Sequence, residues 1–179
     1  LYRERGPELK GSTRKGVQML FNRLYHSRLL SRMLHTLPYL LERELGDCES
    51  VLDLGCGPSS PLRFCATKYS VGVEPYGPYY ERARLSGTHT EVINAKIEDL
   101  EFAEKSFDAV ILIEVIEHLT DEEAMRVLGK AEYWARKKVV VTSPNGFVPQ
   151  GAIDGNELQC HLSGWPLERM ESLGYRCYG

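Results

Sequence analysis

Residues able to bind a ligand stand close together in the stretch "VLDLGCGPSS", residues 51–60. An apolar run ends near the acid Asp53, and Gly55 and Gly57 follow it. A glycine-rich turn directly after a strand lets the backbone approach a ligand closely. The acid just before the glycines offers an acceptor to a cationic group. The turn therefore predicts a ligand site and leaves the ligand to be identified.

Three classes of ligand compete for this turn. A phosphate loop needs the pattern GxxxxGK[ST], and no Gly-Lys-Ser/Thr follows here. A dinucleotide fingerprint needs a third glycine where Ser60 stands. S-adenosylmethionine carries an ammonium group, which Asp53 suits. Glu74 ends the next apolar run, where an acid accepts hydrogen bonds from both hydroxyls of a ribose, so it favours a nucleoside ligand.

A second set of reactive residues follows the apolar run at 106–115. Glu114, Glu117 and His118 are spaced i, i+3 and i+4, so a helical turn would place them on one face. His161 comes later, in "QCHLSGW". We expect His118 and His161 to be the catalytic residues, since an imidazole can act as a general base. The four side chains also have the donors for a divalent metal; the sequence leaves base, metal and simple packing open.

Alternating strands and helices are expected to position these residues. Apolar runs predict strands at residues 50–55, 70–75, 90–95, 106–115 and 137–144, with a sixth starting at 175–179. Helical spacing and cap residues predict helices at residues 17–35, 38–45, 61–69, 77–87, 120–135 and 163–174. The alternation predicts a Rossmann-like α/β fold, an open, mostly parallel sheet with helices on both faces. Its ligand lies beyond the carboxyl ends of the strands.

Charge divides the 179 residues into two parts. Residues 1–43 contain nine Lys/Arg and three Asp/Glu, whereas the remainder contains 13 basic and 22 acidic residues. We therefore expect an N-terminal helical arm or lid at residues 1–46 and a core domain at 47–179. A basic arm suits nucleic acid, an anionic membrane surface, a phosphorylated substrate or plain solvent. The acidic core and a pI of about 6 disfavour RNA.

Cysteine usage and hydropathy bear on the compartment. The five cysteines are odd in number and form no CxxC pair, which disfavours a disulfide framework and favours a reducing, cytoplasmic setting. No apolar run approaches the roughly 20 residues that cross a bilayer. The oligomeric state is not predicted.

From about residue 50 onward the sequence resembles the class I S-adenosylmethionine-dependent methyltransferases with a DLGCG signature, a type 11-like group. Five stretches follow the order and spacing of that family: "VLDLGCG", "VGVEP", "AKIEDLEF", "FDAVILIEVIEHL" and "VVVTSPNGF". The resemblance implies S-adenosylmethionine as cofactor and a set of contacts to it. These are Asp53, Gly55, Cys56 and Gly57 at the methionyl part, Glu74 at the ribose, Ile97 and Glu98 around the adenine, and Ile113 and Glu114 along the cofactor.

The sequence departs from the family pattern at three places. Ser59 stands where a third glycine is common, and Lys96 stands where an Asp is common, so adenine contacts would rely on the backbone at Ile97. The family sheet ends with a reversed seventh strand, which we expect to be missing or truncated here. The implied function is methyl transfer to an unidentified acceptor, a small molecule or a saccharide- or lipid-linked intermediate. The alternatives are methylation of an RNA end and a catalytically silent domain that binds a partner.

Overall fold

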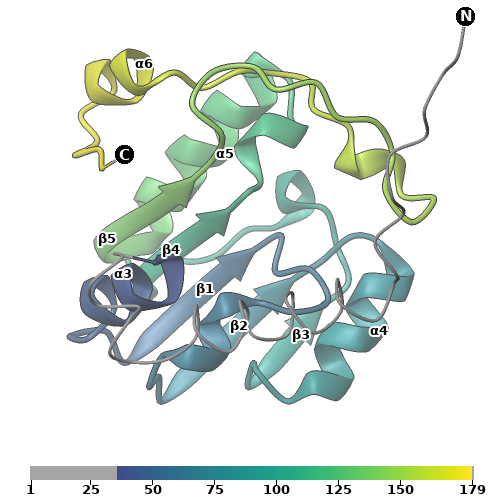
Figure 1. The fold of residues 1–179 in the computed structure, drawn as a ribbon. Coiled ribbons are helices and arrows are strands. Elements are labelled where there is room, and N and C mark those ends of the chain that lie inside the picture. Colours follow the sequence, from purple (N-terminus) through teal and green to yellow (C-terminus); the bar gives the residue numbers. More distant parts are fainter. Residues whose placement is uncertain (1–35, 179) are drawn as a thin grey trace, which may run out of the picture.

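The computed structural model describes residues 36–178, so the helix expected at 17–35 lies outside the described residues. Five parallel strands form one sheet in the order β3-β2-β1-β4-β5 (Figure 1). Their bounds are β1 Ser50–Leu54, β2 Tyr69–Val73, β3 Glu91–Ile93, β4 Phe107–Ile113 and β5 Ala135–Thr142. The predicted Rossmann-like open parallel sheet is confirmed. The strand order reverses between β1 and β4, which is where such sheets bind ligands.

Helices and short 3₁₀ turns connect the strands. The helices are α3 Leu37–Glu44, α4 Gly77–Ser86, α5 Asp121–Trp134 and α6 Leu167–Ser172. The 3₁₀ turns are η1 Pro61–Phe64, η2 Ile97–Asp99, η3 Ile116–His118 and η4 Glu157–Gln159. The expected capping box of α5 is present, because Thr120 and Glu123 exchange side-chain and backbone hydrogen bonds. Gly87 ends α4 with a φ of 67°, as a glycine after a helix does.

Apolar side chains on alternate strand residues fill both faces of the sheet. One face carries Leu52 and Leu54 of β1 and is covered by α5, whose Trp134 is fully buried. The opposite face carries Val51 and is covered by α3, whose Leu41 is 1% exposed. The helix α3 therefore packs directly on the sheet. The domain boundary near residue 46 stays a prediction.

Two of the predicted elements are shorter, and one predicted strand is wrong. The helix expected at 61–69 is a single turn, η1, because the amide of Tyr69 bonds to Glu49 O and starts β2 instead. The last helix begins at Leu167 rather than at residue 163. Residues 175–178 form no sixth strand. The Tyr175 amide bonds back to Met170 O and closes α6, so the backbone does not pair with β5.

A long connection, residues 143–166, joins β5 to α6; we call it the crossing segment. Figure 1 shows it leaving β5 and passing beyond the carboxyl ends of the strands toward α4 before it returns to α6. It stands over the edge of the sheet where a ligand would bind. None of the helices between residues 36 and 178 combines the length and the apolar character that a membrane crossing needs.

Candidate functional site

The turns after β1 and β4 touch each other at the point where strand order reverses. Gly55 has a φ of +70°, and a Cβ placed on it would lie 2.7 Å from Cγ2 of Val115 in the turn after β4. Both the left-handed backbone and the missing side chain are therefore required here. Gly55, which the sequence analysis predicted to be a ligand-site residue, is therefore a point of contact between the turns after β1 and β4.

Gly57 and Glu74 meet across the same crevice. Gly57 has a φ of +57°, and nothing lies within 4 Å of the position where its Cβ would be. Its amide donates a hydrogen bond to Glu74 Oε2 over 3.0 Å, and the amide of Tyr76 donates to Glu74 Oε1 over 2.8 Å. Burial raises the pKa of Glu74, while the two amide bonds oppose that rise. The structure thus brings these two predicted cofactor residues together beside open space.

Asp53 is buried and has partners that the sequence did not reveal. Its side chain is 2% exposed, and its Oδ2 atom accepts hydrogen bonds from Ser60 Oγ at 2.5 Å and from His89 Nε2 at 2.9 Å. The second ring nitrogen of His89, Nδ1, has no hydrogen-bond partner among the described residues. His89 lies in the loop before β3, inside no motif, so no sequence signal pointed to it. Together, Ser60 and His89 fix the orientation of Asp53.

The other predicted cofactor residues line the same edge with different exposures. Cys56 is buried, and burial raises the pKa of its thiol. Ile97 is buried in η2, whereas the next residue, Glu98, is exposed. Ile113 ends β4 and is half-buried. Glu114 is exposed, with a φ of +54°, and its Oε1 accepts a hydrogen bond from the Thr142 hydroxyl over 2.8 Å.

A compact cluster of Glu117, His118 and His161 stands beyond the ends of β4 and β5. One ligand atom from each of the three lies within 4.8 Å of the others, and the two imidazole centroids are 4.9 Å apart. Glu114 does not join this group, because the turn after β4 is a 3₁₀ turn that starts at residue 116 and Glu114 turns to Thr142. The three residues of "EVIEH" therefore do not share one α-helical turn, but the charge of Glu114 still acts on Glu117 and His118. Tertiary structure brings in His161 from 43 positions downstream of His118.

Burial shapes the electrostatics of this cluster. Glu117 is 2% exposed, and neither oxygen of its carboxylate has a hydrogen-bond partner among the described residues. Burial raises the pKa of Glu117 well above its usual range, and the nearby carboxylate of Glu114 adds to the rise. Burial also lowers the pKa of His118. The cluster therefore combines one buried carboxylate with two half-buried imidazoles.

The crossing segment is anchored on both sides of the crevice. On the β4 side, the amides of Leu162 and Ser163 donate to Glu117 O over 2.8 Å and 3.2 Å. On the α4 side, the Tyr79 hydroxyl donates to Asp154 Oδ2 over 2.9 Å. The segment also exposes five large apolar residues: Phe147, Val148, Ile153, Leu158 and Leu162.

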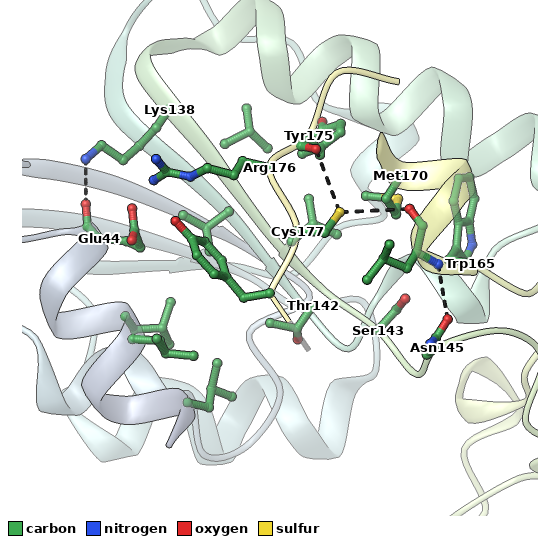
Figure 2. Close-up of a pocket in the computed structure, with 18 of the residues that line it drawn as sticks. Glu44, Lys138, Thr142, Ser143, Asn145, Trp165, Met170, Tyr175, Arg176 and Cys177 are labelled. Atoms are coloured by element: carbon green, nitrogen blue, oxygen red, sulfur yellow. Dashed lines mark hydrogen bonds between the residues drawn. The ribbon is translucent and has the colours of Figure 1, made fainter. Parts of the chain in front are cut away.

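A large cavity lies away from this crevice. It has a volume of about 620 Å³ and runs along the outer edge of β5, between α3, α6 and residues 175–178 (Figure 2). Its walls are mainly apolar, and at one end the ammonium of Lys138 donates to Glu44 O over 2.7 Å. It holds none of the residues with reactive side chains described above. We therefore place the candidate site at the carboxyl edge of the sheet rather than in this cavity.

Comparison with known proteins finds a family match over part of the chain. Residues 52–138 match the family described as "Methyltransferase domain". The chain is 36% identical over 73 residues to "Probable tRNA methyltransferase 9B" of Mus musculus, which covers 41% of this chain and 16% of the mouse protein. The chain therefore spans less than a fifth of the length of that relative.

Solved structures show the same fold. The plantazolicin methyltransferase BpumL in complex with SAH has a TM-score of 0.57 and 18% identity, covering 92% of this chain and 68% of that one. The PH0226 protein from Pyrococcus horikoshii OT3 has a TM-score of 0.54 and 25% identity, covering 68% of this chain and 57% of that one. The chain therefore shares the overall fold of these two structures.

Proposed function

We propose that this chain, whose residues 52–138 form a class I S-adenosylmethionine-dependent methyltransferase domain of the type 11-like group, transfers a methyl group from that cofactor to an acceptor. The observation that carries the proposal is the crevice between Gly57 and Glu74. At Gly57 the backbone is left-handed and carries no side chain. The Glu74 carboxylate accepts hydrogen bonds from the amides of Gly57 and Tyr76. Both residues lie at the edge of the sheet where the strand order reverses.

The residues of the crevice fit the cofactor. Open space beside Gly57 allows the backbone to approach a ligand, and the Glu74 carboxylate can accept hydrogen bonds from ribose hydroxyls. Ile97 offers an apolar surface and Glu98 a neighbouring polar one for the adenine. Asp53, held by two hydrogen bonds, places a buried negative charge near the cationic tail. Cys56, Ile113 and Glu114 complete the proposed contacts.

The protein contributes mainly alignment. When bound, S-adenosylmethionine supplies a methyl group on a sulfonium, which is already an activated electrophile. The chain has to hold the acceptor in line and exclude water, and orientation of this kind lowers a barrier by several kcal/mol. The crossing segment stands over the crevice and suits that role. His118 and His161 stand beside it, where a neutral imidazole can take a proton from a hydroxyl acceptor.

We favour a small molecule, or a saccharide- or lipid-linked intermediate, as the acceptor. Two features support it: the acidic balance of the chain beyond residue 43, and the five exposed apolar residues of the crossing segment. The second candidate is an RNA end, and the observation in its favour is the mouse relative, which is named as a probable tRNA methyltransferase. A silent binding domain is the third. The cytoplasmic setting stays a prediction, and all five cysteines are free thiols.

Calorimetry and labelling separate these candidates. Titration with S-adenosylhomocysteine should show one site per chain; absence of binding would overturn the proposal. Protein supplied with a methyl-labelled cofactor is then incubated with four pools: aqueous metabolites, lipid extract, saccharides and total RNA. Label in one of the first three supports the favoured acceptor, and label in RNA replaces it with the alternative. Cofactor binding with no label in any pool indicates a silent domain.

A further inference from the structure

The carboxylate of Glu117 has no hydrogen-bond partner among residues 36–178. Its side chain is buried to 2% exposure, and both oxygens are without a hydrogen bond among the described residues. Leaving a buried carboxylate unpaired costs free energy, so such a group is normally protonated, paired or bound to a metal. Asp53 and Glu74, the buried acids across the crevice, are by contrast both hydrogen-bonded. Glu117 therefore differs from these two acids, and its carboxylate oxygens are available to a ligand.

The two imidazoles beside Glu117 present the nitrogen that a metal needs. His118 Nδ1 lies 3.3 Å from Cys160 O, and His161 Nδ1 lies 2.6 Å from Val148 O. A carbonyl oxygen only accepts, so each Nδ1 carries the hydrogen and each Nε2 carries the lone pair. A backbone carbonyl on one ring nitrogen is the usual way in which a metal-binding histidine is oriented.

Backbone contacts hold the three side chains together. His161 belongs to the crossing segment, and the following two amides, of Leu162 and Ser163, both donate to Glu117 O. The hydroxyl of Ser163 and the indole of Trp165 donate to Ile116 O over 3.1 Å and 3.2 Å. These hydrogen bonds connect the 3₁₀ turn after β4 to the crossing segment next to the cluster. The three side chains are therefore held near one another without a bound ion.

We propose that Glu117, His118 and His161 bind one divalent transition-metal ion of the Zn²⁺ or Mn²⁺ class, with coordination positions left open. Two imidazole nitrogens and one carboxylate oxygen suit such ions, whereas Mg²⁺ prefers an all-oxygen shell. Three protein ligands leave at least one position for water or an acceptor oxygen. Metal binding at Nε2 excludes the base role for the same nitrogen. The proposal does not depend on methyl transfer.

Direct metal titration tests this site. The whole chain is stripped with a chelator, dialysed and titrated by calorimetry with Zn²⁺, Mn²⁺ and Mg²⁺ in turn. We expect one Zn²⁺ per chain, a rise in melting temperature on Zn²⁺ addition, and binding to Mg²⁺ that is weaker than to both transition metals. Glu117→Gln and His161→Ala should each weaken Zn²⁺ binding about 100-fold. Mutation of a residue that only hydrogen-bonds to a metal ligand already lowers metal affinity 10- to 100-fold, and these two variants change the ligands themselves. Glu117→Gln keeps the shape of the neutral acid, and circular dichroism verifies both folds.

Two matched controls define the outcome. Glu157→Gln removes an exposed acid of the crossing segment, and Cys160→Ser removes the nearest thiol. Both should bind Zn²⁺ like the parent. No Zn²⁺ binding by the parent, unchanged binding by Glu117→Gln and His161→Ala, preference for Mg²⁺, or loss in Cys160→Ser would each overturn the assignment. S-adenosylhomocysteine binding is measured on the same samples, so failure here is distinguished from failure of the proposed function.

Discussion

The two sides of the crevice differ in how their polar groups are satisfied. On the β1–β2 side, the buried carboxylates of Asp53 and Glu74 have hydrogen bonds from Ser60, His89 and two backbone amides. On the β4–β5 side, the equally buried carboxylate of Glu117 has none among the described residues. The first side is preorganised by the chain itself. On the second side, Glu117 keeps a carboxylate without a hydrogen bond from the described residues.

The largest expected effect tests whether ligand binding on the β1–β2 side requires a residue without a side chain at position 57. Gly57→Val should weaken S-adenosylhomocysteine binding by more than 100-fold, because a branched side chain would enter the open space beside the turn. Gly87→Val is the matched control, since Gly87 has a similar φ of +67° and open surroundings but ends α4. Both variants should lose roughly 1–2 kcal/mol of stability in urea unfolding. Parental binding by Gly57→Val would contradict the proposed cofactor position.

The contact between the two sides is tested at Gly55. Gly55→Ala should lower the free energy of unfolding by about 3 kcal/mol, which combines left-handed strain with a Cβ placed 2.7 Å from Val115. Gly57→Ala, with the same strain and no clash, should lose only about 1 kcal/mol. Urea unfolding of both variants measures the difference. Equal losses would mean that the turns after β1 and β4 are not packed together.

A variant of Glu74 tests whether a carboxylate that already accepts two backbone hydrogen bonds also binds the ribose of the cofactor. Glu74→Ala should weaken S-adenosylhomocysteine binding by about 1–3 kcal/mol, the scale of a hydrogen bond to a charged group. Calorimetry on Glu81→Ala provides the control, since Glu81 is an exposed acid on the neighbouring helix α4. If the affinity of Glu74→Ala equals that of the parent, the ribose contact is elsewhere.

The smallest effect has the opposite sign on the two sides. In the presence of a chelator, Glu117→Met should stabilise the protein by about 1 kcal/mol, since it removes a buried carboxylate without hydrogen bonds and fills its volume. Glu74→Met should destabilise it, because the amides of Gly57 and Tyr76 lose their acceptor. Urea unfolding at neutral pH measures both. Destabilisation in both variants would remove the contrast between the sides.

Local patterns predicted most of the fold and the first half of the site. The five strands, α4 and the capping box of α5 were predicted from apolar runs and cap residues, which act over a few positions. The turn at Gly55 and Gly57 was predicted for the same reason, since glycine is the residue that most readily adopts a left-handed backbone. The wrong sixth strand shows the limit. Residues 175–178 have a strand-like pattern, but pairing with the edge strand β5 depends on the position and direction of the backbone after α6.

Partnerships between distant residues were decided only by the tertiary structure. His89 reaches Asp53 from 36 positions away, and no motif marks it. The sequence grouped Glu114 with Glu117 and His118 by helical spacing, whereas the left-handed backbone at Glu114 turns it to Thr142 on β5. His161 joins the cluster because the crossing segment bonds to Glu117 O. Sequence spacing determines short-range backbone geometry, and only packing of the strands and loops decides which side chains share a buried space.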